Sequence, residues 1–109
     1  MYKVFKDIEF EKEGDLIPVI VQDINTKDIL ILAYVNREAL ENTIKSGKAW
    51  FWSRSRNKLW MKGEESGNFQ HVKKIMVDCD SDALVYLVES TGPACHTGNR
   101  TCFHNELQK

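Results

Sequence analysis

The sequence has no long apolar run, only two prolines and no surplus of either charge. Its longest apolar stretch, Ile29 to Val35, is far shorter than the roughly 20 residues that a membrane-spanning helix needs. The 15 lysines and arginines are balanced by 16 aspartates and glutamates, which argues against a broadly basic surface for nucleic acid. The first residues form no apolar segment of the kind found in signal peptides. We therefore expect a soluble, cytoplasmic protein that binds no membrane and no nucleic acid.

No internal repeat and no glycine- or serine-rich linker divides the chain. Its 109 residues, of which 42% are hydrophobic and 28% charged, have an ordinary globular composition and are enough for one core. We expect a single domain over residues 1–109. The three cysteines are an odd number and cannot all pair within one chain, which disfavours a disulfide-stapled secreted domain. Free thiols are then buried filler, metal ligands or catalytic groups.

Short β-strands dominate the pattern, with one clear helix. Asn36 is a good N-cap, apolar residues follow at helical spacing from Ala39, and Gly47 ends the run. Runs of β-branched, aromatic and other apolar residues predict strands at 16–21, 29–35, 49–53, 59–62, 74–79 and 83–89. The sequence therefore predicts a mainly β domain, α+β by content, whose short and mostly antiparallel strands form a barrel-like unit with one main helix.

Three carboxylates, Asp78, Asp80 and Asp82, stand at alternate positions. If this segment stays extended, the three side chains point to one side, where their mutual repulsion favours a compensating cation. Hard oxygen ligands at this spacing suit Mg²⁺. The alternative is a solvated acidic turn between two strands.

The thiols fall at a second kind of candidate site. Cys79 lies between the carboxylates, so in an extended strand its thiol faces the opposite side. Cys95 and Cys102 lie in a polar, glycine-containing tail, with His96 beside the first of them. Thiolates select Zn²⁺ over Mg²⁺, and three protein ligands with an open position are typical of catalytic zinc. The alternative is that the cysteines are buried and inert.

An aromatic and basic stretch runs from Trp50 to Gly63. At a period of two residues, Trp50, Trp52, Arg54 and Arg56 share one side of a strand. Guanidinium groups beside serine hydroxyls suit phosphate oxygens, and an indole suits a purine face. The alternative places the tryptophans in the core, which we favour for them, and the arginines in water.

The chain resembles the phosphoribosyl-AMP cyclohydrolases of histidine biosynthesis over nearly its whole length. The motifs that carry the resemblance are 21–23 (VQD), 32–40 (LAYVNREAL), 52–56 (WSRSR), 59–64 (LWMKGE), 66–67 (SG), 78–82 (DCDSD) and 92–98 (GPACHTG). The departures are small: Thr101 stands where serine often precedes the last cysteine, and Val35 stands where methionine is common. Some members are fused to a phosphoribosyl-ATP pyrophosphohydrolase domain. Because this chain ends seven residues after Cys102, we expect the monofunctional form.

The resemblance implies the metals, their ligands and the fold. It implies that Asp78, Asp80 and Asp82 bind Mg²⁺ and that Cys79, Cys95 and Cys102 bind Zn²⁺. It further implies a β pseudo-barrel capped by a helix, and an intertwined homodimer in which the zinc ligands come from both subunits.

The resemblance also implies the reaction, hydrolysis of the bond between N1 and C6 of the adenine ring in 1-(5-phosphoribosyl)-AMP. Our hypothesis is that the zinc supplies hydroxide, because zinc can lower the pKa of bound water to about 7, and that His96 moves the proton. The magnesium would neutralise or orient the phosphorylated substrate. The expected substrate contacts are Ser53, Arg54, Ser55, Arg56, Trp60 and Lys62.

Two other functions fit parts of the sequence. A small zinc-stabilised module that grips a nucleotide or RNA would use the same tryptophans and arginines; it predicts four zinc ligands, no turnover and unfolding on chelation. A thiol redox protein is disfavoured because no Cys-x-x-Cys motif is present.

Overall fold

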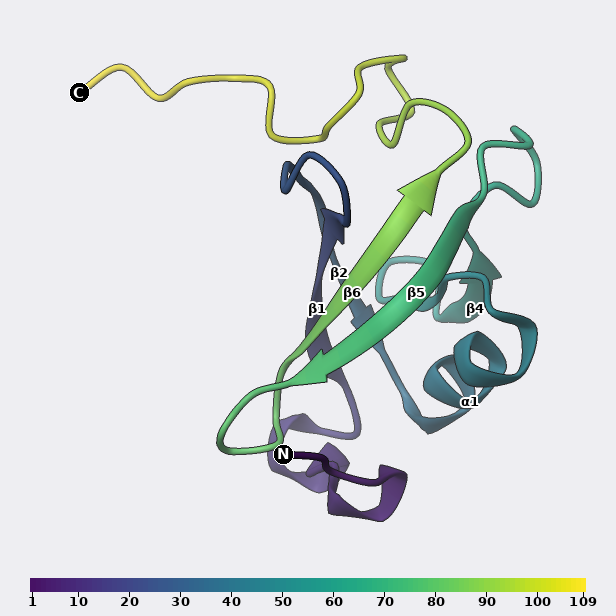
Figure 1. The fold of residues 1–109 in the computed structure, drawn as a ribbon, viewed down its shortest axis with the longest axis vertical. Helices are drawn as coiled ribbons and strands as arrows, with labels where there is room; N and C mark the ends of the chain where they lie inside the picture. Colours follow the sequence, from purple (N-terminus) through teal and green to yellow (C-terminus); the bar gives the residue numbers. More distant parts are fainter.

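The computed structural model describes residues 1–109 apart from the side chain of Glu13. Two short 3₁₀ helices lead into six strands and one α-helix (Figure 1). In chain order the elements are η1 (Phe5–Asp7), η2 (Phe10–Glu13), β1 (Ile17–Asp23), β2 (Ile29–Val35), α1 (Arg37–Ser46), β3 (Trp50–Ser53), β4 (Lys58–Met61), β5 (Gln70–Val77) and β6 (Leu84–Ser90). Every predicted strand and the predicted helix are present, although β5 begins four residues earlier than the predicted 74.

Local sequence accounts for the helix and its ends. The Asn36 side chain accepts a hydrogen bond from the backbone N–H of Ala39 at 2.9 Å, which caps the first turn. Gly47 ends the helix in the left-handed conformation with φ 74°, where a residue without Cβ is unstrained. Both ends of α1 were therefore predictable from single residues.

The strands form a four-stranded sheet of order β2-β1-β6-β5 and a separate β3–β4 hairpin. The pairs β1–β2, β5–β6 and β3–β4 are antiparallel, whereas β1 and β6 run parallel, with Val19 opposite Leu84. The mainly β, α+β prediction is confirmed. The two sheets remain separate and do not close into a barrel. Parallel pairing of β1 with β6 is possible because a long crossover, containing α1 and the hairpin, joins them.

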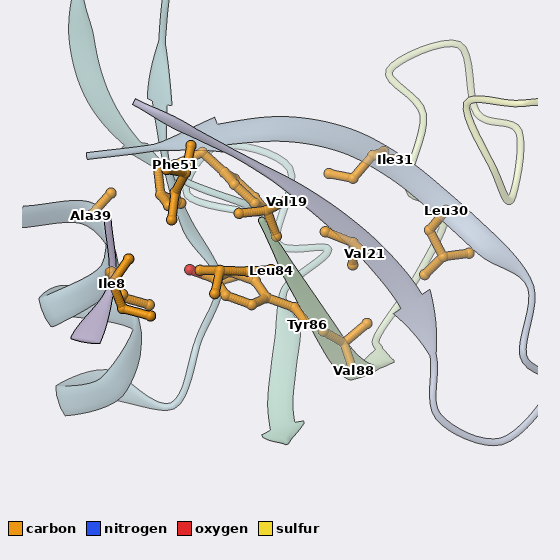
Figure 2. Packing of buried hydrophobic residues seen from close by; sticks show 14 of the residues in the cluster. Ile8, Val19, Val21, Leu30, Ile31, Ala39, Phe51, Leu84, Tyr86 and Val88 are labelled. Carbon is orange, nitrogen blue, oxygen red and sulfur yellow. The ribbon is translucent and has the colours of Figure 1, made fainter. Parts of the chain in front are cut away.

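The core lies between the four-stranded sheet, α1 and the β3–β4 hairpin (Figure 2). Tyr86 of β6 and Phe51 of β3 are fully buried, with ring centroids 6.0 Å apart. Thr43 of α1 ties these elements together: its hydroxyl accepts the Trp50 N–H at 2.9 Å and lies 3.4 Å from the Tyr86 hydroxyl. This packing fixes the hairpin, and with it Trp60, against the sheet.

The opposite face of the sheet carries apolar side chains that the chain covers only in part, because α1 and most of the hairpin lie on the core side (Figure 1). In β1 the residues Ile17, Val19 and Val21 are fully buried, so the alternate positions face outward. Leu32 and Met76 are 48% and 49% exposed. The outward residues include Pro18, Ile20, Leu32, Met76, Val85 and Leu87.

Among the described residues, no helix combines the length and the apolar character that crossing a membrane requires.

Candidate active site

The three carboxylates converge at the turn between β5 and β6. Ligand oxygens of Asp78, Asp80 and Asp82 all lie within 4.8 Å of one another. The segment does not stay extended, so strand alternation cannot align the carboxylates: β5 ends at Val77, short of the predicted 79, and Ser81 has φ 61°. The Asp78 carboxylate accepts the backbone N–H of Asp82 at 2.9 Å, which closes the turn. A turn, rather than strand alternation, therefore gathers the carboxylates.

Positive side chains from the N-terminal segment surround this acidic turn. Lys3 donates to the Ser81 hydroxyl at 2.7 Å and to the Asp78 carbonyl oxygen at 3.1 Å, and Lys12 forms an ion pair with Asp82 at 3.1 Å. The hydrogen bond from the Asp82 N–H holds the pKa of the Asp78 carboxyl below its usual range. Three clustered carboxylates offer the hard oxygen ligands that a divalent cation such as Mg²⁺ prefers. The acidic cluster is therefore able to hold a metal.

Cys95 and Cys102 lie close together in the segment that follows β6. The Thr97 hydroxyl donates to the Cys95 Sγ at 3.0 Å, and this bond lowers the pKa of the Cys95 thiol. Burial and the neighbouring Cys95 raise the pKa of Cys102. Two adjacent thiols, one of them with a lowered pKa, fit a soft ion such as zinc.

The structure does not bring Cys79 to this pair within one chain. Cys79 lies in the β5–β6 turn, whereas Cys95 and Cys102 follow the other end of β6 (Figure 1). The residues Leu84–Ser90 between these ends span about 20 Å as an extended strand. One chain thus offers two clustered thiols and a third that is remote and exposed.

Two hollows meet beside the paired thiols, and His96, Trp60 and Lys62 line both of them. The first has a volume of about 260 Å³ and includes Cys95; the second, of about 370 Å³, includes Cys102. The structure therefore gathers the predicted proton-transfer residue, two predicted thiol ligands and two predicted substrate contacts.

The serines and arginines of residues 53–56 do not lie along one strand, and the two arginines line different hollows. Strand β3 ends at Ser53, whose hydroxyl accepts the Arg56 N–H at 3.2 Å and lies 3.4 Å from that of Ser55. Because the chain turns here, the period-two prediction for Arg54 and Arg56 is wrong. Arg56 lines the 260 Å³ hollow at the thiols, whereas Arg54 points elsewhere.

Arg54 belongs to a third hollow, of about 460 Å³, which Asp82 of the acidic cluster also lines. Its guanidinium stacks on Tyr34 at 3.9 Å from the ring centroid. Sequence reasoning missed Tyr34 because it was counted only as part of a buried strand. The sequence held no signal for it, because the outward position of Tyr34 follows from its pairing with Pro18, which only the structure shows.

Comparison with known proteins identifies the family of the chain. The family model described as phosphoribosyl-AMP cyclohydrolase matches residues 31–104. A phosphoribosyl-AMP cyclohydrolase of Nitrosopumilus maritimus is 69% identical over 99% of this chain and 100% of its own length. Those of Cenarchaeum symbiosum and Archaeoglobus fulgidus are 67% and 58% identical, over 98% and 94% of this chain and 99% and 94% of their own lengths. The chain therefore belongs to the phosphoribosyl-AMP cyclohydrolase family and is an enzyme of the hydrolase class.

Proposed function

We propose that this enzyme hydrolyses the N1–C6 bond of the adenine ring in 1-(5-phosphoribosyl)-AMP, the ring-opening step of histidine biosynthesis. The observation that carries the proposal is the gathering of His96, Trp60 and Lys62 around two neighbouring thiols, in a chain whose relatives bear that enzyme name. Alkylation at N1 leaves the purine electron-poor, so C6 accepts an oxygen nucleophile.

Cys95 and Cys102 would hold zinc together with the partner's Cys79, because the Cys79 of the same chain lies at the opposite end of β6. A zinc ion bound to thiolates supplies Lewis acidity that lowers the pKa of a bound water to about 7. Asp78, Asp80 and Asp82 would hold Mg²⁺, in agreement with the 4.8 Å clustering of their oxygens.

A homodimer follows from this ligand arrangement. The outward, partly exposed apolar face of the four-stranded sheet supports it, because burial of side chains such as Leu32 and Met76 against a second copy would be favourable. Each copy would then contribute one Cys79 and one Cys95–Cys102 pair, which gives two equivalent zinc sites.

The chain's own residues supply proton transfer and substrate binding. His96 is exposed at the junction of the two hollows, where its imidazole can take a proton from the attacking water and return it to the ring nitrogen. Trp60 offers an aromatic surface for the purine, while Lys62 and Arg56 offer positive charge to one phosphate. Arg54, stacked on Tyr34 beside the acidic cluster, would meet the other phosphate, and Ser53 and Ser55 hydrogen-bond within the turn that carries it.

The direct test is incubation of the purified protein with 1-(5-phosphoribosyl)-AMP and Mg²⁺, with and without a zinc chelator, following the absorbance change on ring opening. We expect turnover that the chelator removes and that added zinc restores. Absence of turnover by a folded, zinc-loaded dimer supplied with magnesium would contradict the proposal and favour a nucleotide-binding module.

His96→Ala is expected to lower kcat by about 100-fold, at the low end of the range for a lost general acid or base, with KM little changed. Zinc content, measured in parallel, should remain that of the wild type. His71→Ala, on strand β5, is the matched control and should retain full kcat. A wild-type kcat in zinc-loaded His96→Ala would remove the proton-transfer role.

Arg54→Ala is expected to raise KM by about 10-fold, since a charge-assisted hydrogen bond to a phosphate is lost. Steady-state kinetics measure the effect, and Lys58→Ala in the same hairpin serves as a charge-matched control. Unchanged kcat and KM in Arg54→Ala would show that Arg54 makes no contact with substrate.

A further inference from the structure

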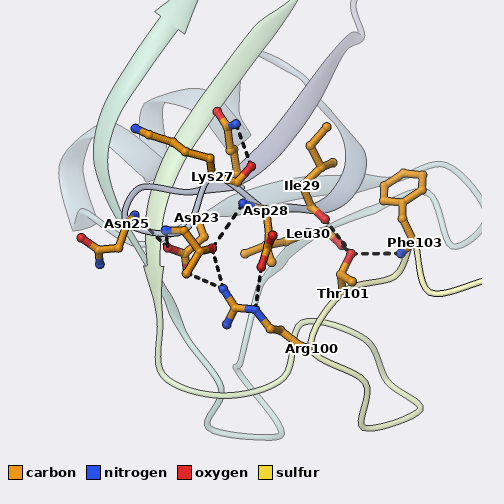
Figure 3. Close-up of polar contacts among 11 residues, drawn as sticks. Asp23, Asn25, Lys27, Asp28, Ile29, Leu30, Arg100, Thr101 and Phe103 are labelled. Carbon is orange, nitrogen blue, oxygen red and sulfur yellow. Dashed lines mark hydrogen bonds and ion pairs between the residues drawn. The ribbon is translucent and has the colours of Figure 1, made fainter.

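The segment that carries the second thiol has no regular secondary structure to hold it. After β6 ends at Ser90, residues 91–109 form neither helix nor strand. Individual hydrogen bonds must therefore set the position of Cys102 relative to Cys95. The contacts that do so converge on one arginine, Arg100, and on the turn between β1 and β2 (Figure 3).

Asp23, the last residue of β1, is the buried half of this contact. It is only 7% exposed, although it carries a charge. One carboxylate oxygen accepts the backbone N–H groups of Asn25 and Thr26 at 2.8 and 2.9 Å, and the other accepts Arg100 Nη2 at 3.1 Å. The Thr26 N–H above all, with help from Asn25 and Arg100, holds the pKa of Asp23 below its usual range against the effect of burial. Both oxygens of Asp23 are thus committed, one to the turn and one to Arg100.

Arg100 spreads its guanidinium over the same turn. In addition to Asp23, Nη2 donates to the Thr26 hydroxyl at 2.8 Å and Nε donates to Asp28 at 3.1 Å. The three acceptors lie on a turn more than 70 residues away in the sequence. They suit the planar guanidinium of an arginine, whose N–H donors have fixed directions. A lysine could not satisfy all three directions at once.

Backbone hydrogen bonds next to Arg100 connect its contacts with the turn to both cysteines. Its carbonyl oxygen accepts the Ala94 N–H at 3.1 Å, and the neighbouring Asn99 carbonyl accepts the Cys95 N–H at 3.1 Å. On the other side, the Cys102 N–H donates to the Leu30 carbonyl of β2 at 2.8 Å. Backbone hydrogen bonds on one side of Arg100 therefore hold Cys95, and a backbone hydrogen bond on the other side holds Cys102.

A buried carboxylate is costly unless it is paired, and a neutral asparagine at position 23 could still accept the Asn25 and Thr26 N–H groups. An asparagine at position 23 would therefore keep an acceptor for the turn but lose the negative charge that faces Arg100. We propose that Asp23 and Arg100 are positioning residues that lock the cysteine segment onto the β1–β2 turn and thereby set the spacing of Cys95 and Cys102. The proposal rests on the proposed function only for the statement that these thiols hold zinc.

Asp23→Asn separates the two roles of the carboxylate, because it keeps the turn acceptor but presents an N–H₂ donor to Arg100. Arg100→Gln removes the guanidinium, which is the half-exposed partner of Asp23. We expect each variant to bind zinc about 10- to 100-fold more weakly in chelator competition, the range for loss of an outer-shell support. In the full-length protein stripped of zinc, binding of phenylarsine oxide, which needs two adjacent thiols, should weaken in parallel. Arg100→Lys should restore part of both signals.

Glu11→Gln is the matched control, since it removes the carboxylate partner of another arginine, Arg37, in the N-terminal segment. It should leave zinc affinity and arsenical binding unchanged. If Asp23→Asn and Arg100→Gln lower the melting temperature but keep wild-type values in both assays, the contact of Asp23 with Arg100 only stabilises the fold. The proposal is then overturned. If Asp23→Asn fails to fold, Arg100→Gln decides alone. The arsenical assay uses no substrate, so its result stands whether or not the enzyme turns over phosphoribosyl-AMP.

Discussion

Cys95→Ser is expected to lower kcat by more than about 10³-fold and to release zinc, because loss of an outer-shell partner alone costs about 10- to 100-fold. Serine replaces a soft thiolate by a hydroxyl that stays protonated at neutral pH, so the ion loses a ligand. The Thr97 hydroxyl that donates to the Cys95 Sγ can donate to the serine oxygen instead. The fold should therefore survive.

The measurement combines metal analysis, steady-state kinetics and circular dichroism on the same preparation. Thr97→Ser, which keeps the hydroxyl donor beside Cys95, is the matched control and should retain zinc and most of the activity. Full zinc occupancy together with a wild-type kcat in Cys95→Ser would exclude Cys95 as a ligand.

Co-expression of Cys79→Ser chains with Cys95→Ser chains is expected to recover activity that neither variant has alone. In a mixed dimer, the Cys95→Ser chain still supplies an intact Cys79, and the Cys79→Ser chain supplies an intact Cys95–Cys102 pair. One of its two sites is then complete. If half of the dimers are mixed, activity returns to about a quarter of the wild-type value, as two-fold symmetry of the interface requires.

The control for this experiment is co-expression of Cys95→Ser with Cys102→Ser. Both changes lie in the paired-thiol half of the site, so every site in the mixed dimer keeps one damaged pair and no activity should return. Recovery in the control, or none in the Cys79→Ser and Cys95→Ser mixture when mixed dimers are present, would contradict a zinc site shared between subunits. Light scattering tests the oligomeric state independently, and a monomer in solution would also contradict the shared site.

The local elements of this fold were readable from short stretches of sequence. Asn36 and Gly47 fixed the ends of α1, because capping depends on the side chain or the backbone freedom of single residues. The run of apolar and β-branched residues at 16–21 predicted strand β1, whereas which of its faces meets the core is seen only in the structure. The candidate site residues were likewise readable as types, since carboxylates and thiolates differ in the metals that they prefer.

Relations between distant segments, in contrast, were decided only by the tertiary structure. No periodicity in the sequence predicts the parallel pairing of β1 with β6 or the contact of Asp23 with Arg100, 77 residues apart. Nor does it predict that Arg54 and Arg56 line different hollows. The left-handed backbone of Ser81, which gathers the carboxylates, occurs at a residue that does not ordinarily favour it. Sequence periodicity reports only neighbours within a few residues, whereas these contacts depend on how the packed core brings separate segments together. The sequence by itself determined the elements and the chemistry of the side chains, and the packing of the sheet determined which of those side chains meet.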